Sequence, residues 1–160
     1  MLRYLVGSDR QLRAAFTREW ARLSCEGKPC FIVDTLLACK ADGILRAGGS
    51  PAGLDALQMC RPFTAYQLVR ALDELLGNPP DAPVHITSLT ALLDEAEGGE
   101  RVRLAARLFA RVRALGKTNG LLVGWGAGRP GPDEPPEAWL NANGALQSMP
   151  GPRYAAGSRS

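Results

Sequence analysis

The fold is decided by the stretch Leu2-Arg3-Tyr4-Leu5-Val6-Gly7-Ser8-Asp9-Arg10-Gln11, which passes from a buried strand into a helix. Residues 2–6 are a short apolar run ended by Gly7, a pattern typical of a strand. Ser8 followed three residues later by Gln11 is the pattern of a capping box, which begins a helix. Apolar residues then recur at helical spacing until Gly27. The stretch therefore predicts the first strand and helix of a βαβ unit.

Strands and helices continue to alternate beyond Gly27. Residues 30–35, 83–89 and 120–125 are apolar runs with the length of buried strands. Two helices are expected between them, one capped by Thr64 and ended by Gly77, the other with an apolar stripe over residues 104–115. Residues 36–60 are broken by glycines and Pro51, which predicts two short helices. This alternation predicts an α/β fold with a mostly parallel sheet and helices on both faces.

The composition changes after residue 126. We expect residues 1–126 to form the α/β core and residues 127–160 to be a Gly/Pro-rich segment, because its prolines cannot propagate helix or sheet. Trp139-Leu140 is the part of this segment suited to packing back onto the core, and residues 149–160 are expected to be a disordered tail.

Length, charge and hydropathy narrow the function classes. The 160 residues have the size of one domain, and no apolar run reaches the roughly 18 residues of a membrane span. The N-terminal apolar stretch turns polar at Ser8, too early for a signal peptide, so we expect a cytoplasmic protein. The net charge of +3 permits contact with DNA but does not indicate a dedicated nucleic-acid binder.

Cysteine and histidine usage argues against a metal site. The four cysteines contain no Cys-x-x-Cys pair, so we expect reduced thiols; they are Cys25, Cys30, Cys39 and Cys60. His85 is the only histidine, and its place in an apolar run predicts a neutral, hydrogen-bonded core residue. We predict neither a metal site nor a bound cofactor.

Several short motifs occur in a defined order. Residues 33–36, Val-Asp-Thr-Leu, end the second predicted strand, and Arg61 with Gln67-Leu68 opens the next strong helix. A strand over residues 84–89 and a long helix leading into a last strand follow. This order resembles the core of RecA/RadA recombinases, in which corresponding strands carry a phosphate loop, Asp-Thr-Glu and the Walker B motif. The resemblance covers residues 2–126 and implies a truncated RecA-like core.

The resemblance also implies a phosphate loop after the first strand, and the sequence departs from it. Such a loop reads Gly-x-x-x-x-Gly-Lys-Ser/Thr, and counting from Gly7 places Leu12, Arg13 and Ala14 on its last three positions. Leu12 has a side chain where the backbone must approach phosphate, and Ala14 lacks the hydroxyl that binds Mg²⁺. Arg13 keeps a positive charge, which a solvated helix face explains equally well.

Two further motif positions have lost their acidic residue. Thr87 stands where Walker B requires an acid, and Leu36 stands where the family's catalytic glutamate follows Asp-Thr. These substitutions predict that nucleotide is not hydrolysed and that the chain has no catalytic residues. An unrelated α/β protein that never bound nucleotide would lack the same residues, and this alternative stays open. Asp34 lies at a strand end, where open α/β sheets bind ligands, or it caps the next helix.

Three arginines are candidates for contact with DNA or a partner. Arg103, Arg107 and Arg111 are four residues apart on one face of the long helix. The alternative is a solvated face balanced by the preceding acids, Asp94, Glu95, Glu97 and Glu100.

The function expected from these features is that of a non-catalytic RecA/RadA-like paralogue. It would act through protein–protein contacts in DNA recombination or repair, with a RecA/RadA-type recombinase as one possible partner. No segment before residue 2 supplies a polymerisation arm, so we expect no filament of this chain alone. The alternatives are a SulA-like inhibitor of cell division with a RecA-like fold, and a small enzyme with a site around Asp34.

Overall fold

The computed structural model describes residues 2–126 and 154–155, and one parallel sheet organises them. The strands are β1 (Leu2–Gly7), β2 (Cys30–Val33), β3 (Leu57–Cys60), β4 (Val84–Ile86), β5 (Leu121–Gly126) and β6 (Tyr154–Ala155). Their order across the sheet is β3-β2-β4-β5-β1-β6, and every neighbouring pair is parallel. The predicted α/β class with a parallel sheet is confirmed.

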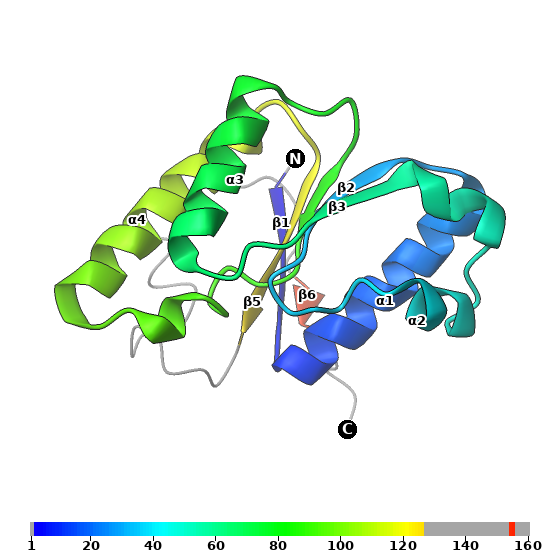
Figure 1. The fold of residues 1–160 in the computed structure, drawn as a ribbon, viewed down its shortest axis with the longest axis horizontal. Helices are drawn as coiled ribbons and strands as arrows, with labels where there is room; N and C mark the ends of the chain where they lie inside the picture. The colour runs from blue at the N-terminus through cyan, green and yellow to red at the C-terminus, as the bar shows by residue number, and fades with distance from the viewer. Residues whose placement is uncertain (1, 127–153, 156–160) are drawn as a thin grey trace.

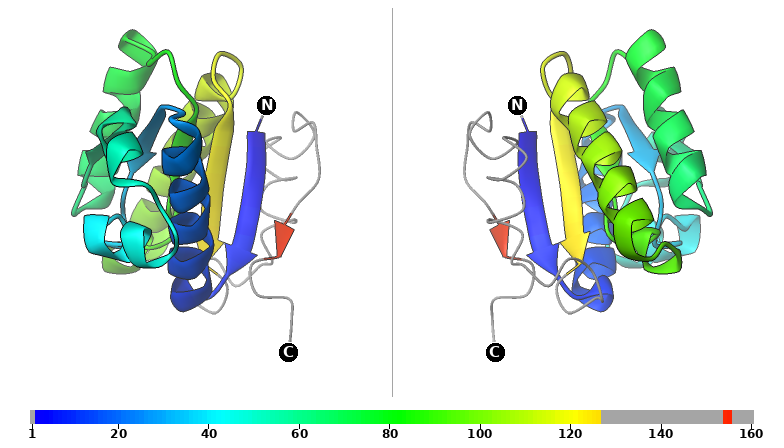
Figure 2. Two further views of the ribbon diagram at one scale, coloured as in Figure 1. Left: turned by 90° about the vertical axis from the view of Figure 1, so that its right-hand side faces the viewer. Right: turned by 90° about the vertical axis from the view of Figure 1, so that its left-hand side faces the viewer.

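Helices cover both faces of the sheet (Figures 1 and 2), as predicted. One face carries α1 (Asp9–Glu26) with α2 (Ala41–Arg46) and a short 3₁₀ helix, η1 (Pro51–Ala56). The other face carries α3 (Ala65–Gly77) and α4 (Gly98–Leu115), and a second 3₁₀ helix, η2 (Leu93–Glu95), precedes α4. Each layer encloses its own hydrophobic core, because alternate side chains of the buried strands point to opposite faces.

The helix starts lie where local side-chain chemistry places them. The Ser8 hydroxyl accepts a hydrogen bond from the Gln11 amide, and the Gln11 side chain accepts one from the Ser8 amide, so the predicted capping box is present. Gly27 ends α1 in the left-handed conformation, with a φ of 64°. The Thr64 hydroxyl likewise caps α3 by accepting from the Gln67 amide.

Three strand assignments differ from the sequence predictions. The strand predicted over residues 83–89 is limited to β4 (Val84–Ile86), because the chain leaves the sheet at Thr87 to hydrogen-bond other loops. The strand β3 (Leu57–Cys60) was not predicted. It lies within residues 36–60, where the sequence predicted only two short helices, because a half-exposed edge strand lacks a continuous apolar pattern. The strand β6 was not predicted either. It lies inside the segment expected to be a disordered tail, and its residues Tyr154 and Ala155 pair with Leu5 and Val6 of β1. Two residues are too short for any sequence pattern.

The other predictions for the C-terminal segment, including packing of Trp139-Leu140, fall on residues 127–153 and 156–160, outside the described residues. Within the described part of the chain, no helix combines the length and apolar character that a membrane crossing requires.

Candidate functional site

Buried polar side chains gather at the carboxyl ends of β2 and β4, which are neighbours in the sheet. Asp34 and Thr35 follow β2 directly, and Thr87 and Ser88 follow β4. All four are less than a tenth exposed. Arg61, one residue after β3, reaches the same place through an ion pair with Asp34. We call these five residues the edge network.

The Asp34 carboxylate is fully buried and holds the following loop closed. Its Oδ1 accepts hydrogen bonds from the Ala38 amide at 3.0 Å and the Thr87 hydroxyl at 3.3 Å. Its Oδ2 accepts from the Cys39 amide at 2.9 Å and from Arg61 Nε at 3.2 Å. The sequence left open whether Asp34 binds a ligand or caps a helix. Both oxygens tie the loop before α2, whose own N-cap is Lys40.

Arg61, which follows β3, also bonds to the loop that Asp34 holds closed. Besides Asp34, its guanidinium donates to the Cys39 carbonyl, so one side chain joins the loops that follow β2 and β3. No local pattern in the sequence predicts this role for Arg61, because the pairing depends on β2 and β3 being neighbours.

Thr87, which the resemblance would place in Walker B, makes several buried hydrogen bonds. Its hydroxyl oxygen accepts from the amides of Thr35 at 2.8 Å and Leu36 at 3.2 Å, and its proton is donated to Asp34. An aspartate here would bring a second carboxylate within hydrogen-bond distance of Asp34, which like-charge repulsion opposes. A threonine at position 87 is therefore compatible with the buried Asp34 carboxylate, whereas an acidic residue there would be repelled by it.

The remaining hydroxyl groups connect the loops after β2, β4 and β5. The Thr35 hydroxyl donates to the Ser88 carbonyl at 2.7 Å and accepts from the Ser88 amide at 3.0 Å. The Thr90 hydroxyl accepts from the Gly126 amide at 3.0 Å, where β5 ends. These bonds satisfy buried polar groups with one another and make this edge of the sheet rigid.

The positions aligned with a phosphate loop do not surround an open cradle. Only Ser8 separates β1 from α1, so there is almost no loop, as the short spacing predicted. The Gln11 amide already donates a hydrogen bond to the Ser8 hydroxyl, so it is not available to a phosphate. Asp9 adds a negative charge to the first turn of α1, which would repel a phosphate there.

The three side chains at the end of that motif point to different surroundings. Leu12 is fully buried in the core beneath α1, whereas Ala14 is exposed. Arg13 Nε donates to the Leu36 carbonyl at 2.9 Å and so fastens α1 to the loop after β2. Leu36, where the resemblance would place a catalytic glutamate, is 3% exposed and packs in the same core as Leu12.

Leu37 is the conformational outlier of the described chain. Its φ of 55° is in the left-handed region, which glycine adopts readily and a leucine does not. Its side chain is nevertheless 51% exposed, so no core packing accounts for the choice of leucine. Strained residues of this kind gather at functional positions held by their surroundings. Leu37 was not among the predicted site residues, because a leucine gives no local signal for a left-handed turn.

Two exposed aromatic residues follow β3 at the same edge. Phe63 is 62% exposed, and Tyr66, in the first turn of α3, is 55% exposed and donates a hydrogen bond to Glu100 of α4. Leu37 and Phe63 are each two residues along the chain from the Cys39–Arg61 hydrogen bond, which places them at neighbouring loops. We call Leu37, Phe63 and Tyr66 the apolar rim.

The three predicted arginines are not equivalent. Arg111 forms a two-pronged ion pair with Asp73 of α3, with Nε–Oδ1 and Nη2–Oδ2 distances of 2.6 and 3.3 Å. It therefore fastens α4 to α3. Arg103 and Arg107 are exposed on α4, so two of the three predicted contact residues face solvent.

His85 lies in β4 as a buried, hydrogen-bonded core residue, as predicted. Its Nδ1 accepts a hydrogen bond from Trp20 Nε1 at 3.2 Å, and burial lowers the pKa of His85 to about 4. The four thiols are not paired in disulfides, in agreement with the prediction, and burial raises the pKa of Cys30 to about 12 and of Cys39 to about 11. Among the described residues, no three His, Cys, Asp or Glu side chains are grouped as metal ligands.

The depressed pKa of His85 predicts a loss of stability in acid. Because the unfolded histidine titrates near 6.5 and the folded one near 4, the unfolded chain binds the extra proton between these values. The stabilisation is complete above pH 6.5 and is lost as the pH falls toward 4. We expect His85 to account for about 2 kcal/mol of lost unfolding free energy at roughly pH 5.

Urea unfolding of the wild type and His85→Gln at a series of pH values measures this contribution. The glutamine can still accept from Trp20 but does not titrate, so its stability should fall less between neutral pH and about pH 4. Parallel pH profiles for the two proteins would contradict the assignment.

No model of a known protein family matches the chain, and a search of curated proteins finds no relative of it.

Proposed function

We propose that this chain is a non-catalytic RecA/RadA-like domain that acts in DNA recombination or repair by contacting another protein. The all-parallel sheet and the order of its elements are compatible with a truncated RecA-like core. The observation that carries the proposal is the edge network. At the strand ends where α/β proteins usually bind ligands, the buried polar groups of this chain form hydrogen bonds between loops.

Nucleotide hydrolysis would require groups that, at this edge of the sheet, are already engaged in hydrogen bonds or in core packing. The Thr87 hydroxyl, which would have to support a metal ion, is occupied by two amides and Asp34. Leu36, in place of the base, lies in the core. The start of α1, in place of a phosphate loop, is closed by its own capping box. An edge held rigid in this way is better suited to presenting a fixed surface to another protein than to hydrolysing nucleotide.

The apolar rim supplies that surface. It presents three large exposed side chains, two of them aromatic, and aromatic residues are enriched in protein–protein interfaces. The left-handed backbone of Leu37 costs roughly 1–2 kcal/mol, which a glycine would avoid. Keeping an exposed leucine at this cost supports a role for its side chain outside the folded core.

Nucleotide binding tests the non-catalytic half of the proposal. Titration of the full chain with Mg-ATP and with a non-hydrolysable analogue, followed by calorimetry, should give no saturable heat, and no phosphate should be released with or without DNA. Saturable binding with turnover would overturn it.

Affinity capture tests the contact half. From nuclease-treated lysate of the native host, the wild type should recover a RecA/RadA-type recombinase, and Leu37→Gly should recover at least tenfold less. Because glycine removes the left-handed strain, Leu37→Gly should melt no lower than the wild type. The matched control is Met59→Ser, which removes a similarly exposed apolar side chain from β3 outside the rim and should leave capture unchanged.

Two results would contradict the contact proposal. Equal recovery by the wild type and Leu37→Gly would remove the rim from the interface. Recovery of a cell-division protein in place of a recombinase would move the function to the SulA-like class.

A further inference from the structure

A pocket lies at the amino ends of three neighbouring strands, β3, β2 and β4, whereas the edge network lies at their carboxyl ends. Its walls are the segments that lead into the strands: Pro29 before β2, Asp55 within η1, and Asp81 before β4. Phe31 and Gln58, paired in register across β2 and β3, complete the lining. We call it the amino-end pocket. Its volume of about 290 Å³ is close to the lower limit for ligand pockets, roughly 300 Å³, and suits a single side chain better than a nucleotide.

Both acidic walls of the pocket are held in place by contacts outside it. The Asn119 side chain donates hydrogen bonds of 2.8 and 3.0 Å to the two carbonyl groups that flank Asp81 in the chain. Gly53 of η1 packs so closely on α1 that a Cβ there would lie 1.8 Å from the Ser24 carbonyl oxygen. Asp55 and Asp81 therefore belong to rigid segments, and little backbone ordering opposes binding between them.

The two carboxylates of the pocket are not compensated by the protein. Asp55 and Asp81 are exposed, and within the described part of the chain neither side chain makes a hydrogen bond or an ion pair. Lys28, the base that precedes Pro29, is already paired with Glu26, with an Nζ–Oε2 distance of 2.7 Å. Two uncompensated negative charges therefore flank the pocket, so it favours a cation.

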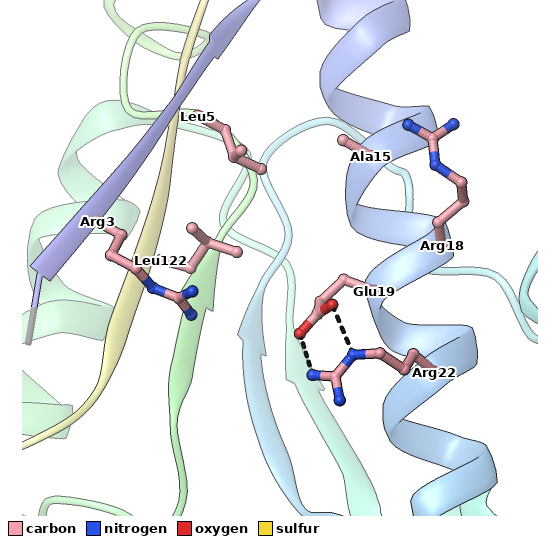
Figure 3. A pocket seen from close by; sticks show the side chains of 7 residues that line it. All are labelled: Arg3, Leu5, Ala15, Arg18, Glu19, Arg22 and Leu122. Carbon is pink, nitrogen blue, oxygen red and sulfur yellow. Dashed lines mark hydrogen bonds and ion pairs between the residues drawn. The ribbon is translucent and has the colours of Figure 1, made fainter. Parts of the chain in front are cut away.

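The hollow between β1 and α1 differs in this respect (Figure 3). There the Arg22 guanidinium donates to both carboxylate oxygens of Glu19, at 2.6 and 3.1 Å, and also bonds to Glu26. Because these charges already compensate one another, they gain little from a ligand. The amino-end pocket is the one whose charges need an outside partner.

The rest of the lining narrows the choice of cation. A calcium ion takes about six to eight oxygen ligands, more than two carboxylates and one amide supply. An ammonium group is compact and strongly hydrated, so Phe31 and the proline Pro29 offer it little. A guanidinium satisfies both kinds of wall, because its planar face packs on rings while its N–H groups donate to carboxylates.

We propose that the amino-end pocket binds an arginine side chain of a partner protein, with the guanidinium between Asp55 and Asp81 and the aliphatic stem against Phe31. The source is a polypeptide, because the pocket opens beside the edge strand β3, where Gln58 and Met59 are exposed and a passing chain can reach it. This site is additional to the apolar rim and does not depend on the loss of nucleotide hydrolysis.

A nuclear magnetic resonance titration of the ¹⁵N-labelled full chain with the peptide Gly-Ser-Leu-Arg-Leu-Ser-Gly tests the proposal. We expect saturable shifts of the amides that line the pocket, and binding that weakens as salt is added, because exposed charges are screened. Citrulline in place of the arginine keeps the shape without the charge and should bind at least tenfold more weakly. Lysine in its place should bind at least threefold more weakly, and calcium chloride should cause no saturable shift.

Three variants locate the site. Asp55→Asn and Asp81→Asn should each weaken binding of the arginine peptide at least tenfold. The matched control is Glu97→Gln, which removes an exposed carboxylate outside the pocket that makes no capping hydrogen bond, and should leave binding unchanged. All three should melt close to the wild type, because neither aspartate has a partner to lose and the glutamate caps no helix.

Four results would each overturn the proposal: no saturable shift, equal binding of the citrulline peptide, equal losses from Asp81→Asn and Glu97→Gln, or saturable binding of calcium. Free arginine that binds as tightly as the peptide would assign the pocket to a small guanidine compound in place of a partner protein. The nucleotide and recombinase-capture experiments probe the other end of the strands, so the two proposals fail independently.

Discussion

Asp34→Ala is expected to lower the free energy of unfolding by about 3–4 kcal/mol, although it removes only three heavy atoms. The carboxylate is fully buried and accepts from two backbone amides, a hydroxyl and a guanidinium. Its loss leaves the Ala38 and Cys39 amides without acceptors. Arg61 is 32% exposed, so water compensates it in part, and we place the effect toward the lower end for broken buried pairs.

Chemical denaturation of the variant measures this loss. The matched control is Asp42→Ala, which removes an aspartate that is 68% exposed and paired with Arg46 on the surface of α2, and should change stability little. Asp34→Asn should lie between the two, since an amide keeps one acceptor oxygen. An unfolding free energy for Asp34→Ala equal to that of Asp42→Ala would show that the edge network does not stabilise the fold.

Gly124→Ala is expected to lower the free energy of unfolding by about 3 kcal/mol, at the upper end for added volume in a packed interior. A Cβ at this position of β5 would lie 1.9 Å from the Thr87 carbonyl oxygen and 3.2 Å from a ring carbon of Phe16. The first neighbour is backbone and cannot rotate away. The chain leaving β4 would have to move, breaking the hydrogen bond of 2.9 Å from the Leu89 amide to the Gly124 carbonyl.

Gly43→Ala is the control for this substitution. It adds the same methyl group to α2, where a Cβ meets nothing within 4 Å. Since alanine is the better helix former, it should gain about 0.5–1 kcal/mol. Thermal unfolding of both variants shows whether the close approach at Gly124 decides the result. Two similar melting temperatures would mean that the strands separate at little cost.

Asp34→Ala and Gly124→Ala both act on the junction of β2, β4 and β5, where the edge network holds the loops together. If the apolar rim depends on this junction, both should also reduce capture of the partner, in parallel with their stability. Leu37→Gly differs, because it should reduce capture without lowering stability. This contrast separates a residue that builds the surface from one that touches the partner.

The sequence by itself determined the elements whose causes are local. The two helix caps are examples, because each hydrogen bond joins residues only three positions apart: Ser8 with Gln11, and Thr64 with Gln67. Such a pattern can be read directly from the sequence. The apolar runs of the buried strands and the stripe of α4 are likewise periodic signals. Together they predicted the α/β class, the parallel sheet and the buried state of His85.

Only the tertiary structure decided how the strand ends meet. In the order β3-β2-β4-β5-β1-β6, β4 lies beside β2 although β3 comes between them in the chain, so the bonds between Thr87 and both Asp34 and Thr35 join residues more than 50 positions apart. The bonds that the Thr87 hydroxyl makes with Asp34, Thr35 and Leu36 all depend on that order. No local pattern encodes them, because each interaction forms only after non-adjacent strands have paired.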